Sequence, residues 1–205
     1  MIISGSFIVL DKRPYRESAL LLRGVSPDYG RIAFVLHGGQ SGTEKFPQAD
    51  LYRELEIEFM DDESGKDIFT ARKVDLLTDY SGIADNSKSF RMAGRIGNFL
   101  LENMPPSEVQ PYTYDTLRSV LANLALPPDT PGVWSLIQCA VVIKTTFLYE
   151  NGMLPEAADP AQNDFLENLV ASGIDNSPLP ECPEKYWNAL NQWLNSLIEY
   201  HQLKR

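Results

Sequence analysis

Hydrophobic residues in the first forty positions occur in short runs separated by turn-forming residues. The runs Phe7–Leu10, Ala19–Leu22 and Ile32–Leu36 are each four or five residues long. Short apolar runs bounded by Asp, Pro, Gly or Ser favour strands. Between the last two runs, Ser26–Gly30 supplies the Pro and the Gly that a reverse turn prefers. We therefore expect these two runs to form a hairpin.

Two further strands are predicted downstream. Leu51–Met60 alternates apolar and charged residues, which is the period of a half-buried strand. Asp61–Lys66 is a polar turn containing Gly, and Asp67–Leu77 carries enough β-branched and aromatic residues to pair with the preceding strand. Five short strands within about eighty residues suit a five-stranded barrel of the oligonucleotide-binding type, the OB-fold.

The apolar period changes after Gly82 from two residues to three or four, which indicates helices. We expect helices within Ser89–Asn103 and around Tyr114–Leu124, each followed by a pair of prolines that ends it. Val133–Glu150 is apolar nearly all round, and a helix of that kind is usually buried among others.

The last fifty residues combine an irregular arm with a final helix. Met153–Pro183 contains five of the fourteen prolines and is expected to hold only one helix, at Asn163–Ala171. In the final segment we expect one helix face to dock on the buried helix, and its residues are Tyr186, Leu190, Trp193, Leu194, Leu197, Ile198 and His201. The predicted organisation is an OB-fold barrel over residues 1–81 and an all-α domain over residues 82–205.

Composition narrows the class of protein. No apolar run approaches the roughly 20 residues that a membrane span needs. The segment Met1–Leu10 lacks the basic start and the cleavage site of a signal peptide, so we expect a cytoplasmic protein. Cys139 and Cys182 have no second ligand at metal spacing and are expected to be free thiols. We predict neither a metal nor a cofactor.

Catalytic candidates are scarce. His37 and His201 are the two histidines, and the sequence contains no phosphate loop, no Gly-x-Ser-x-Gly elbow and no paired His–Glu metal motif. His201 falls on the apolar face of the last helix, where packing is the simpler interpretation. His37 opens His-Gly-Gly-Gln at the end of a strand, a position that can carry function. One histidine without a partner is weak evidence for acid–base chemistry, so we do not expect an enzyme.

Charge is distributed unevenly. The net charge is −10, which opposes attraction to phosphates, yet residues 1–35 hold five basic groups against three acidic ones. A Debye length of about 8 Å at physiological salt lets a local basic patch act independently of distant acidic residues. Lys12, Arg13 and Arg16 are candidates for phosphate contact, with Tyr15 as a stacking surface for a base. The alternative is that these are solvated turn charges and that Tyr15 packs on the barrel rim.

Basic residues also recur on the predicted helices. Lys88, Arg91 and Arg95 are spaced three and four apart, opposite the apolar stripe of their helix. Such a row is usually only a solvated face; the functional alternative is a cradle for an acidic peptide. Arg118 and Lys144, which are isolated charges on helices that otherwise look packed, are further candidates for the same cradle.

A resemblance to a known family is carried by Val9-Leu10, Lys12-Arg13, Tyr15–Ser18, Ala19–Leu22, Tyr29-Gly30, Gly38, Phe147–Pro155 and Leu197–Arg205. In these segments the chain resembles the RecO family of bacterial recombination mediators. Two departures from the family pattern stand out. His37 and Gln40 occupy places where the family often has a lysine and an arginine, and no cysteines follow Pro155, where many members carry a zinc finger.

The resemblance implies a barrel and a helical domain without catalytic chemistry. It also implies that the protein binds single-stranded DNA and cooperates with RecR, RecA and the acidic tail of the single-stranded-DNA-binding protein. The candidate contacts to nucleic acid are Lys12, Arg13, Tyr15, Arg16, Arg31 and His37, and those to partners are Lys88, Arg91, Arg95, Arg118 and Lys144. The net negative charge of the chain favours an alternative function, that of an acidic protein–protein adaptor whose barrel has lost nucleic-acid binding.

Overall fold

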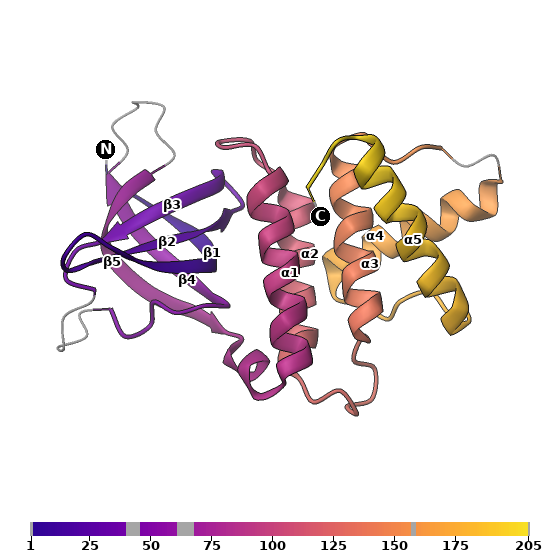
Figure 1. Cartoon of the computed structure of the whole chain (residues 1–205), viewed down its shortest axis with the longest axis horizontal. Helices are drawn as coiled ribbons and strands as arrows, with labels where there is room; N and C mark the ends of the chain where they lie inside the picture. Colours follow the sequence, from indigo (N-terminus) through magenta and orange to yellow (C-terminus); the bar gives the residue numbers. More distant parts are fainter. Residues whose placement is uncertain (1, 40–45, 61–67, 157–158, 205) are drawn as a thin grey trace. The chain divides into compact units, whose positions relative to one another are not determined.

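The computed structural model describes residues 2–39, 46–60, 68–156 and 159–204. In these ranges five strands are followed by a short 3₁₀-helix and five α-helices (Figure 1), which confirms the predicted β-then-α layout. The chain divides into two compact units. The first contains the residues up to Ser81 together with Leu100–Val109, and the second contains Gly82–Phe99 and Gln110–Arg205.

The five strands form a closed barrel in the order β1-β2-β3-β5-β4. The strands are β1 (Ile2–Tyr15), β2 (Ala19–Ser26), β3 (Gly30–Leu36), β4 (Arg53–Met60) and β5 (Ile68–Asp79). Neighbouring strands are antiparallel except β3 and β5, which are parallel. The predicted β2–β3 hairpin and the pairing of β4 with β5 are confirmed. The predicted turn Asp61–Lys66 lies outside the described residues.

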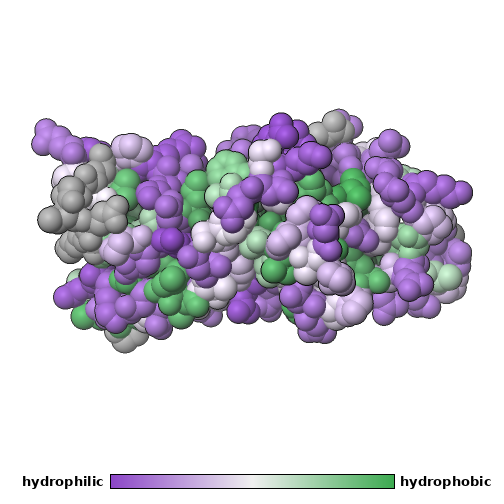
Figure 2. Space-filling view, turned by 90° about the horizontal axis from the view of Figure 1, so that it is seen from below, coloured by the Kyte–Doolittle hydropathy of each residue, from purple (hydrophilic) through white to green (hydrophobic). Residues whose placement is uncertain are grey.

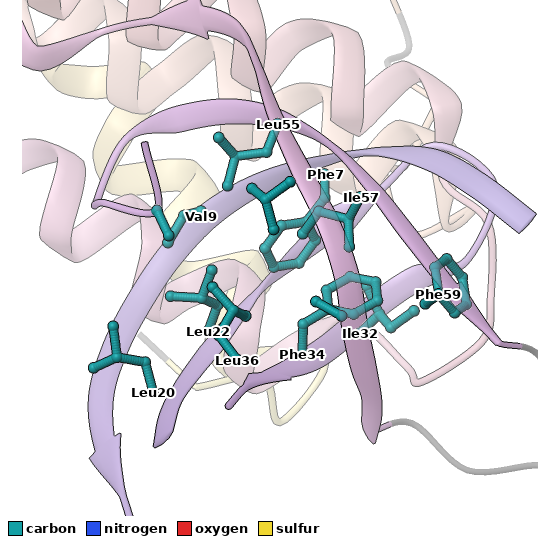
Figure 3. Packing of buried hydrophobic residues seen from close by; sticks show 13 residues of the cluster. Phe7, Val9, Leu20, Leu22, Ile32, Phe34, Leu36, Leu55, Ile57 and Phe59 are labelled. Carbon is teal, nitrogen blue, oxygen red and sulfur yellow. The ribbon is translucent and has the colours of Figure 1, made fainter. Parts of the chain in front are cut away.

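The barrel interior is built from alternate residues of β1, β2, β3 and β4, together with Ala71 and Val74 of β5. Figure 3 shows side chains from β1, β2, β3 and β4 converging on one apolar core. Phe34 lies at its centre, with ring centroids 5.0 Å from both Phe7 and Phe59 in edge-to-face geometry. Such aromatic pairs are worth about 0.5–1.5 kcal/mol each beyond the area they bury. The core therefore connects strands that are distant in sequence.

Strand β1 is longer than the sequence pattern predicted. The expected strand was Phe7–Leu10 followed by a basic turn, whereas β1 continues to Tyr15 and only Arg16–Ser18 remain as the turn. Lys12 pairs with Leu22 of β2, and Arg13 pairs with Leu21. Charged residues are compatible with a strand when their side chains reach water, so the charges of this segment do not mark its end.

Glycine at position 24 lets β1 and β2 approach closely. A Cβ placed on Gly24 would lie 1.8 Å from the carbonyl oxygen of Ile8, far inside any normal contact. The close approach is next to a register shift between Val9 and Asp11 on β1. A bulge of this kind bends a strand and increases its twist, which helps a small sheet to close.

The helices keep their predicted order but differ in their bounds. They are η1 (Ser81–Asp85), α1 (Ser87–Asn103), α2 (Pro111–Ala125), α3 (Leu136–Glu150), α4 (Pro160–Asp175) and α5 (Glu184–Tyr200). Helix α3 begins later than predicted because Ser135 and Gln138 form a capping box at its start. Helix α4 is longer than predicted, since Asp159 caps its first turn and Asn176 ends it in the left-handed conformation.

Helix α3 is the centre of the second unit and contacts α2, α4 and α5 (Figure 1). Its residues are buried on nearly every side, as the sequence predicted. At its end, the Glu150 carboxylate accepts hydrogen bonds from the backbone N–H groups of Tyr112 (2.9 Å) and Thr113 (2.8 Å). Glu150 thereby satisfies two of the N–H groups that the first turn of α2 leaves without intrahelical partners.

The expected docking face of α5 is partly wrong. The buried residues of this helix are Trp187, Leu194 and Ile198, whereas the side chains of Tyr186 and Trp193 are 58% and 36% exposed. Neighbouring residues of a helix differ by about 100° in direction, so centring the stripe on Tyr186 instead of Trp187 rotates it toward solvent. His201 lies at the end of the helix with Nε2 3.0 Å from the carbonyl oxygen of Met153, in agreement with a packing role.

The helices in the described ranges are too short or too polar to cross a lipid bilayer.

Replacing Gly24 by alanine should unfold the barrel or destabilise it by about 3 kcal/mol or more, because the new methyl group overlaps the Ile8 backbone. Urea denaturation followed by circular dichroism measures this change. Gly5→Ala is the matched control in β1, since its Cβ would meet nothing nearer than the Tyr29 ring at 3.5 Å. Equal stability of the two variants would contradict the close approach.

The two cysteines should differ sharply in reactivity. Burial in α3 raises the pKa of the Cys139 thiol to about 12, so at pH 8 almost none of it is thiolate. Cys182 is only partly buried. A thiol reagent such as dithionitrobenzoate should label one cysteine per native chain and two after denaturation. Cys182→Ser should remove the native reaction, and rapid labelling of both thiols in folded protein would contradict this assignment.

Candidate functional site

Three arginines lie on the outward face of strands β1, β2 and β3. Directly paired residues of adjacent strands share a face, and Asp11 pairs with Arg23, which in turn pairs with Ala33. Arg13 is two residues from Asp11 and Arg31 is two residues from Ala33, so strand alternation places both arginines on that same face. The core residues of β2 and β3 point the other way.

Asp11 connects two of these arginines. Its Oδ2 atom lies 2.7 Å from Nε of Arg13 and 3.5 Å from Nη1 of Arg23. Two guanidinium groups therefore share one carboxylate, and the cluster of Asp11, Arg13 and Arg23 keeps one net positive charge. The Arg13 side chain is mostly exposed, so a ligand can reach it from solvent.

Arg31 is held by the protein backbone. Its Nη1 donates a 2.7 Å hydrogen bond to the carbonyl oxygen of Leu101, in the last turn of α1. Basic side chains commonly bind the free carbonyls at a helix end. Arg31 and Arg23 also line one shallow groove of about 230 Å³, together with Leu21, Ile32, Ala33 and Ile68. The hydrogen bond orients Arg31 without cancelling its charge.

The remaining predicted nucleic-acid contacts are spread over the barrel. Lys12 is on the opposite side of β1 from Arg13, and its Nζ lies 3.3 Å from Asp50. Arg16, in the β1–β2 turn with a φ of 52°, places its guanidinium carbon 5.2 Å from the Tyr15 ring centroid. His37 is exposed in the turn after β3. The predicted cluster is therefore not a single turn. Lys12 and Arg13 lie on opposite sides of strand β1, and only Arg16 belongs to the turn.

Sequence reasoning left Arg23 out of the predicted contacts. The signal for it was present in β2, where Leu20 and Leu22 point into the core. Period-two alternation then places Arg23 outward, beside the basic residues of β1.

In the second unit, Arg95 and Lys144 line the same cavity of about 510 Å³. The cavity lies among α1, α3 and α5, and most of its lining is apolar: Met92, Ile96, Phe99, Ile137, Ala140, Ile143 and Ile198. Asn98, Asn191 and Asn195 supply the polar part of its wall. The chain thus places two cations against an apolar hollow, although 49 positions separate them in sequence.

Two asparagines of α5 position the Lys144 ammonium group. Nζ of Lys144 donates to Oδ1 of Asn191 at 2.9 Å and to Oδ1 of Asn195 at 2.8 Å. Both acceptors are neutral amides, so these bonds orient the charge without neutralising it. Residues spaced i and i+4 share a helix face, and this Asn pair is the sequence signal that was missed.

The other predicted partner contacts do not join this cavity. Lys88 lines a separate hollow of about 700 Å³ with Trp134 and Ser135. Arg91 donates from Nε to the backbone oxygen of Ser87 at 3.2 Å, and Arg118 lies 3.8 Å from Asp115 on α2. The structure therefore brings together Arg95 and Lys144 but not all five residues of the expected cradle.

Within the described ranges, no three residues of the His, Cys, Asp and Glu types come together in a way that suits a metal ion.

Neither the protein-family models nor the curated proteins with which the chain was compared match it.

Proposed function

We propose that this chain is a non-enzymatic, RecO-like recombination mediator that binds single-stranded DNA on its barrel and partner proteins on its helical unit. The observation that carries the proposal is the closed strand order β1-β2-β3-β5-β4 with outward arginines on β1, β2 and β3. This order, with a parallel β3–β5 pair, suits an OB-fold. OB-folds bind oligonucleotides on the face of strands 2 and 3 and on the loop after strand 1.

The residues at these positions fit a single strand of nucleic acid. Arg13, Arg23 and Arg31 offer guanidinium groups to phosphates on the strand face. Tyr15 and Arg16 lie at the β1–β2 turn, where the ring can stack on a base. Stacking of this kind contributes about 1–3 kcal/mol per base and tolerates any sequence.

The helical cavity fits a peptide that combines an apolar side chain with a carboxylate. Its walls are apolar, and Arg95 and Lys144 supply positive charge. The acidic tail of the single-stranded-DNA-binding protein, a partner implied by the resemblance, has this chemistry. RecR-like and RecA-like proteins are the further partners that the resemblance implies.

A second function is favoured by a separate observation. Lys12 pairs with Asp50, Arg13 pairs with Asp11, and Arg31 is bound to a backbone carbonyl. These contacts are made within the barrel itself, and the chain carries a net charge of −10. Both facts favour an acidic protein–protein adaptor whose barrel does not bind nucleic acid.

Fluorescence anisotropy of a labelled single-stranded DNA, titrated at several salt concentrations, separates the two functions. Binding of single-stranded DNA weakens with salt by a slope of about 0.7 per phosphate contact, so Arg13→Ala/Arg16→Ala should lower the slope by about 1.4. At 0.1 M salt, the loss of these two phosphate contacts corresponds to roughly 10- to 30-fold weaker binding. The control Arg72→Ala/Lys73→Ala removes the same charge from exposed positions of β5.

An unchanged affinity of the folded Arg13→Ala/Arg16→Ala variant would remove these two arginines as the phosphate contacts. Absence of wild-type binding even at low salt would instead support the adaptor function.

The cavity is tested with a fluorescein-labelled peptide in which a run of aspartates precedes a C-terminal phenylalanine. Arg95→Ala should weaken binding about tenfold or more, because a charge-assisted contact to the peptide carboxylate is lost. Arg118→Ala removes another exposed arginine, which does not line the cavity, and should leave affinity unchanged. Equal effects of the two variants would show that only net charge matters.

A further inference from the structure

Helices α1 and α3 begin at the same end of the second unit (Figure 1), and their first turns line one hollow of about 700 Å³. The lining includes Ser87 and Lys88 from the start of α1 and Ser135, Leu136 and Ile137 from the start of α3. A hollow of this volume is in the range of sites that bind small molecules. The two helices contain 17 and 15 residues, so the positive ends of two helix dipoles lie at this α1–α3 hollow.

The positive ends of α1 and α3 lack acidic side chains in their own first turns. The other three α-helices of the described ranges each have a carboxylate at the start. Glu150 binds the first turn of α2, Asp159 caps α4, and Glu184 lies in the first turn of α5. The neutral side chains of Asn86 and Ser135 cap α1 and α3 instead. The two helix starts without an anion of their own are therefore the two that meet in one hollow.

Several backbone donors at the α1–α3 hollow have no acceptor. The first four N–H groups of an α-helix have no intrahelical partner. The side chains of Asn86 and Ser135 accept hydrogen bonds from three of these groups, at 2.9, 3.2 and 3.4 Å. The N–H groups of Ser87, Leu136 and Ile137 remain without an acceptor in the described part of the chain.

Two buried side chains add further donors. Ser89 and Trp134 line the hollow and are only 5% and 6% exposed. Among the described residues, nothing accepts a hydrogen bond from the Ser89 hydroxyl or from the Trp134 indole N–H. Neither polar atom is fully enclosed, so each reaches the space that its residue lines. Because buried polar groups are normally hydrogen-bonded, these two donors indicate an acceptor that the chain itself does not supply.

The lining combines positive charge with an apolar wall. Lys88 is exposed, and its ammonium group has no ion-pair partner within the described ranges. Asp85, also exposed, is the acidic residue of the lining, and Leu126, Pro128 and Val133 belong to its apolar part. Figure 2 is seen from below, the side on which α1 and α3 begin in Figure 1, and hydrophobic surface (green) lies there among hydrophilic side chains (purple). Such a lining suits a ligand with an anionic end and an apolar or aromatic body.

We propose that the α1–α3 hollow binds a small organic phosphate, with the phosphate group at the two helix starts and the body on the apolar wall. Helix starts bind phosphate through backbone N–H groups and the helix dipole. The donors here are three backbone N–H groups, a hydroxyl, an indole N–H and an ammonium group. A phosphate monoester has three strong acceptor oxygens and a carboxylate has two, so this set of donors favours phosphate. The site is separate from the barrel face and from the Arg95–Lys144 cavity.

Two-dimensional ¹⁵N NMR of the full chain, titrated with adenosine monophosphate, tests the site. We expect saturable shifts of the amide signals of Ser87, Leu136 and Ile137 and of the Trp134 indole signal, which Trp134→Phe identifies by its absence. Adenosine lacks the phosphate and should not bind, and inorganic phosphate lacks the body and should bind at least about fivefold more weakly. Shifts confined to other residues, or equal affinities for the nucleotide and adenosine, overturn the site. Equal affinity for inorganic phosphate overturns the role of the apolar wall.

Substitutions separate these donors from a general effect of charge. Lys88→Ala and Ser89→Ala should weaken nucleotide binding by about fivefold and about threefold, because each removes one donor to the phosphate. Asp85→Asn should strengthen binding, since it removes a negative charge from the lining. The control Lys185→Ala removes an exposed lysine of α5 that does not line the hollow and should leave the affinity unchanged. Circular dichroism melting confirms that the variants are folded. Equal losses in Lys88→Ala and Lys185→Ala, or full affinity of folded Ser89→Ala, overturn the proposal.

Discussion

Three residue pairs between the parallel strands β3 and β5, from Ala33–Ile68 to Val35–Thr70, close the barrel. A sheet that closes on itself has no free edges, and its inward residues meet in one core. Phe34 belongs to this short contact and also touches Phe7 and Phe59, so closure and core packing depend on the same residue. The outward arginines of β1, β2 and β3 then occupy one face because the closed sheet fixes the direction of each strand.

The second unit depends on α3 in a comparable way. Close approach of α4 is possible because Gly173 has no side chain; a Cβ there would lie 2.7 Å from Cγ1 of Val142. Helix α3 also carries Lys144, which donates hydrogen bonds to two asparagines of α5, and Glu150, which caps α2. One buried helix thus sets the positions of the three helices around it and of a cation in the cavity.

Much of the fold was predictable because local periodicity survives in the structure. The β2–β3 hairpin follows from its turn residues, and the apolar segment of α3 follows from its composition. The end of β1 was not predictable from charge, since Lys12 and Arg13 reach solvent from within a strand. The α5 stripe was misplaced because this helix has apolar residues on two adjacent faces, with Trp187 on one and Tyr186 on the other.

Other features follow only from tertiary structure. Parallel pairing of β3 with β5 and the meeting of Arg95 with Lys144 join residues that no local pattern connects.

The carboxylate shared by Arg13 and Arg23 has a consequence for the entropy of binding. Long basic side chains on a free surface lose rotamer freedom when an anion fixes them, at a cost of about 0.5–1.5 kcal/mol each. Asp11 already restricts both guanidinium groups in the folded protein. Binding of an anion to this face therefore costs less rotamer entropy, because the single Asp11 carboxylate already restricts both arginines.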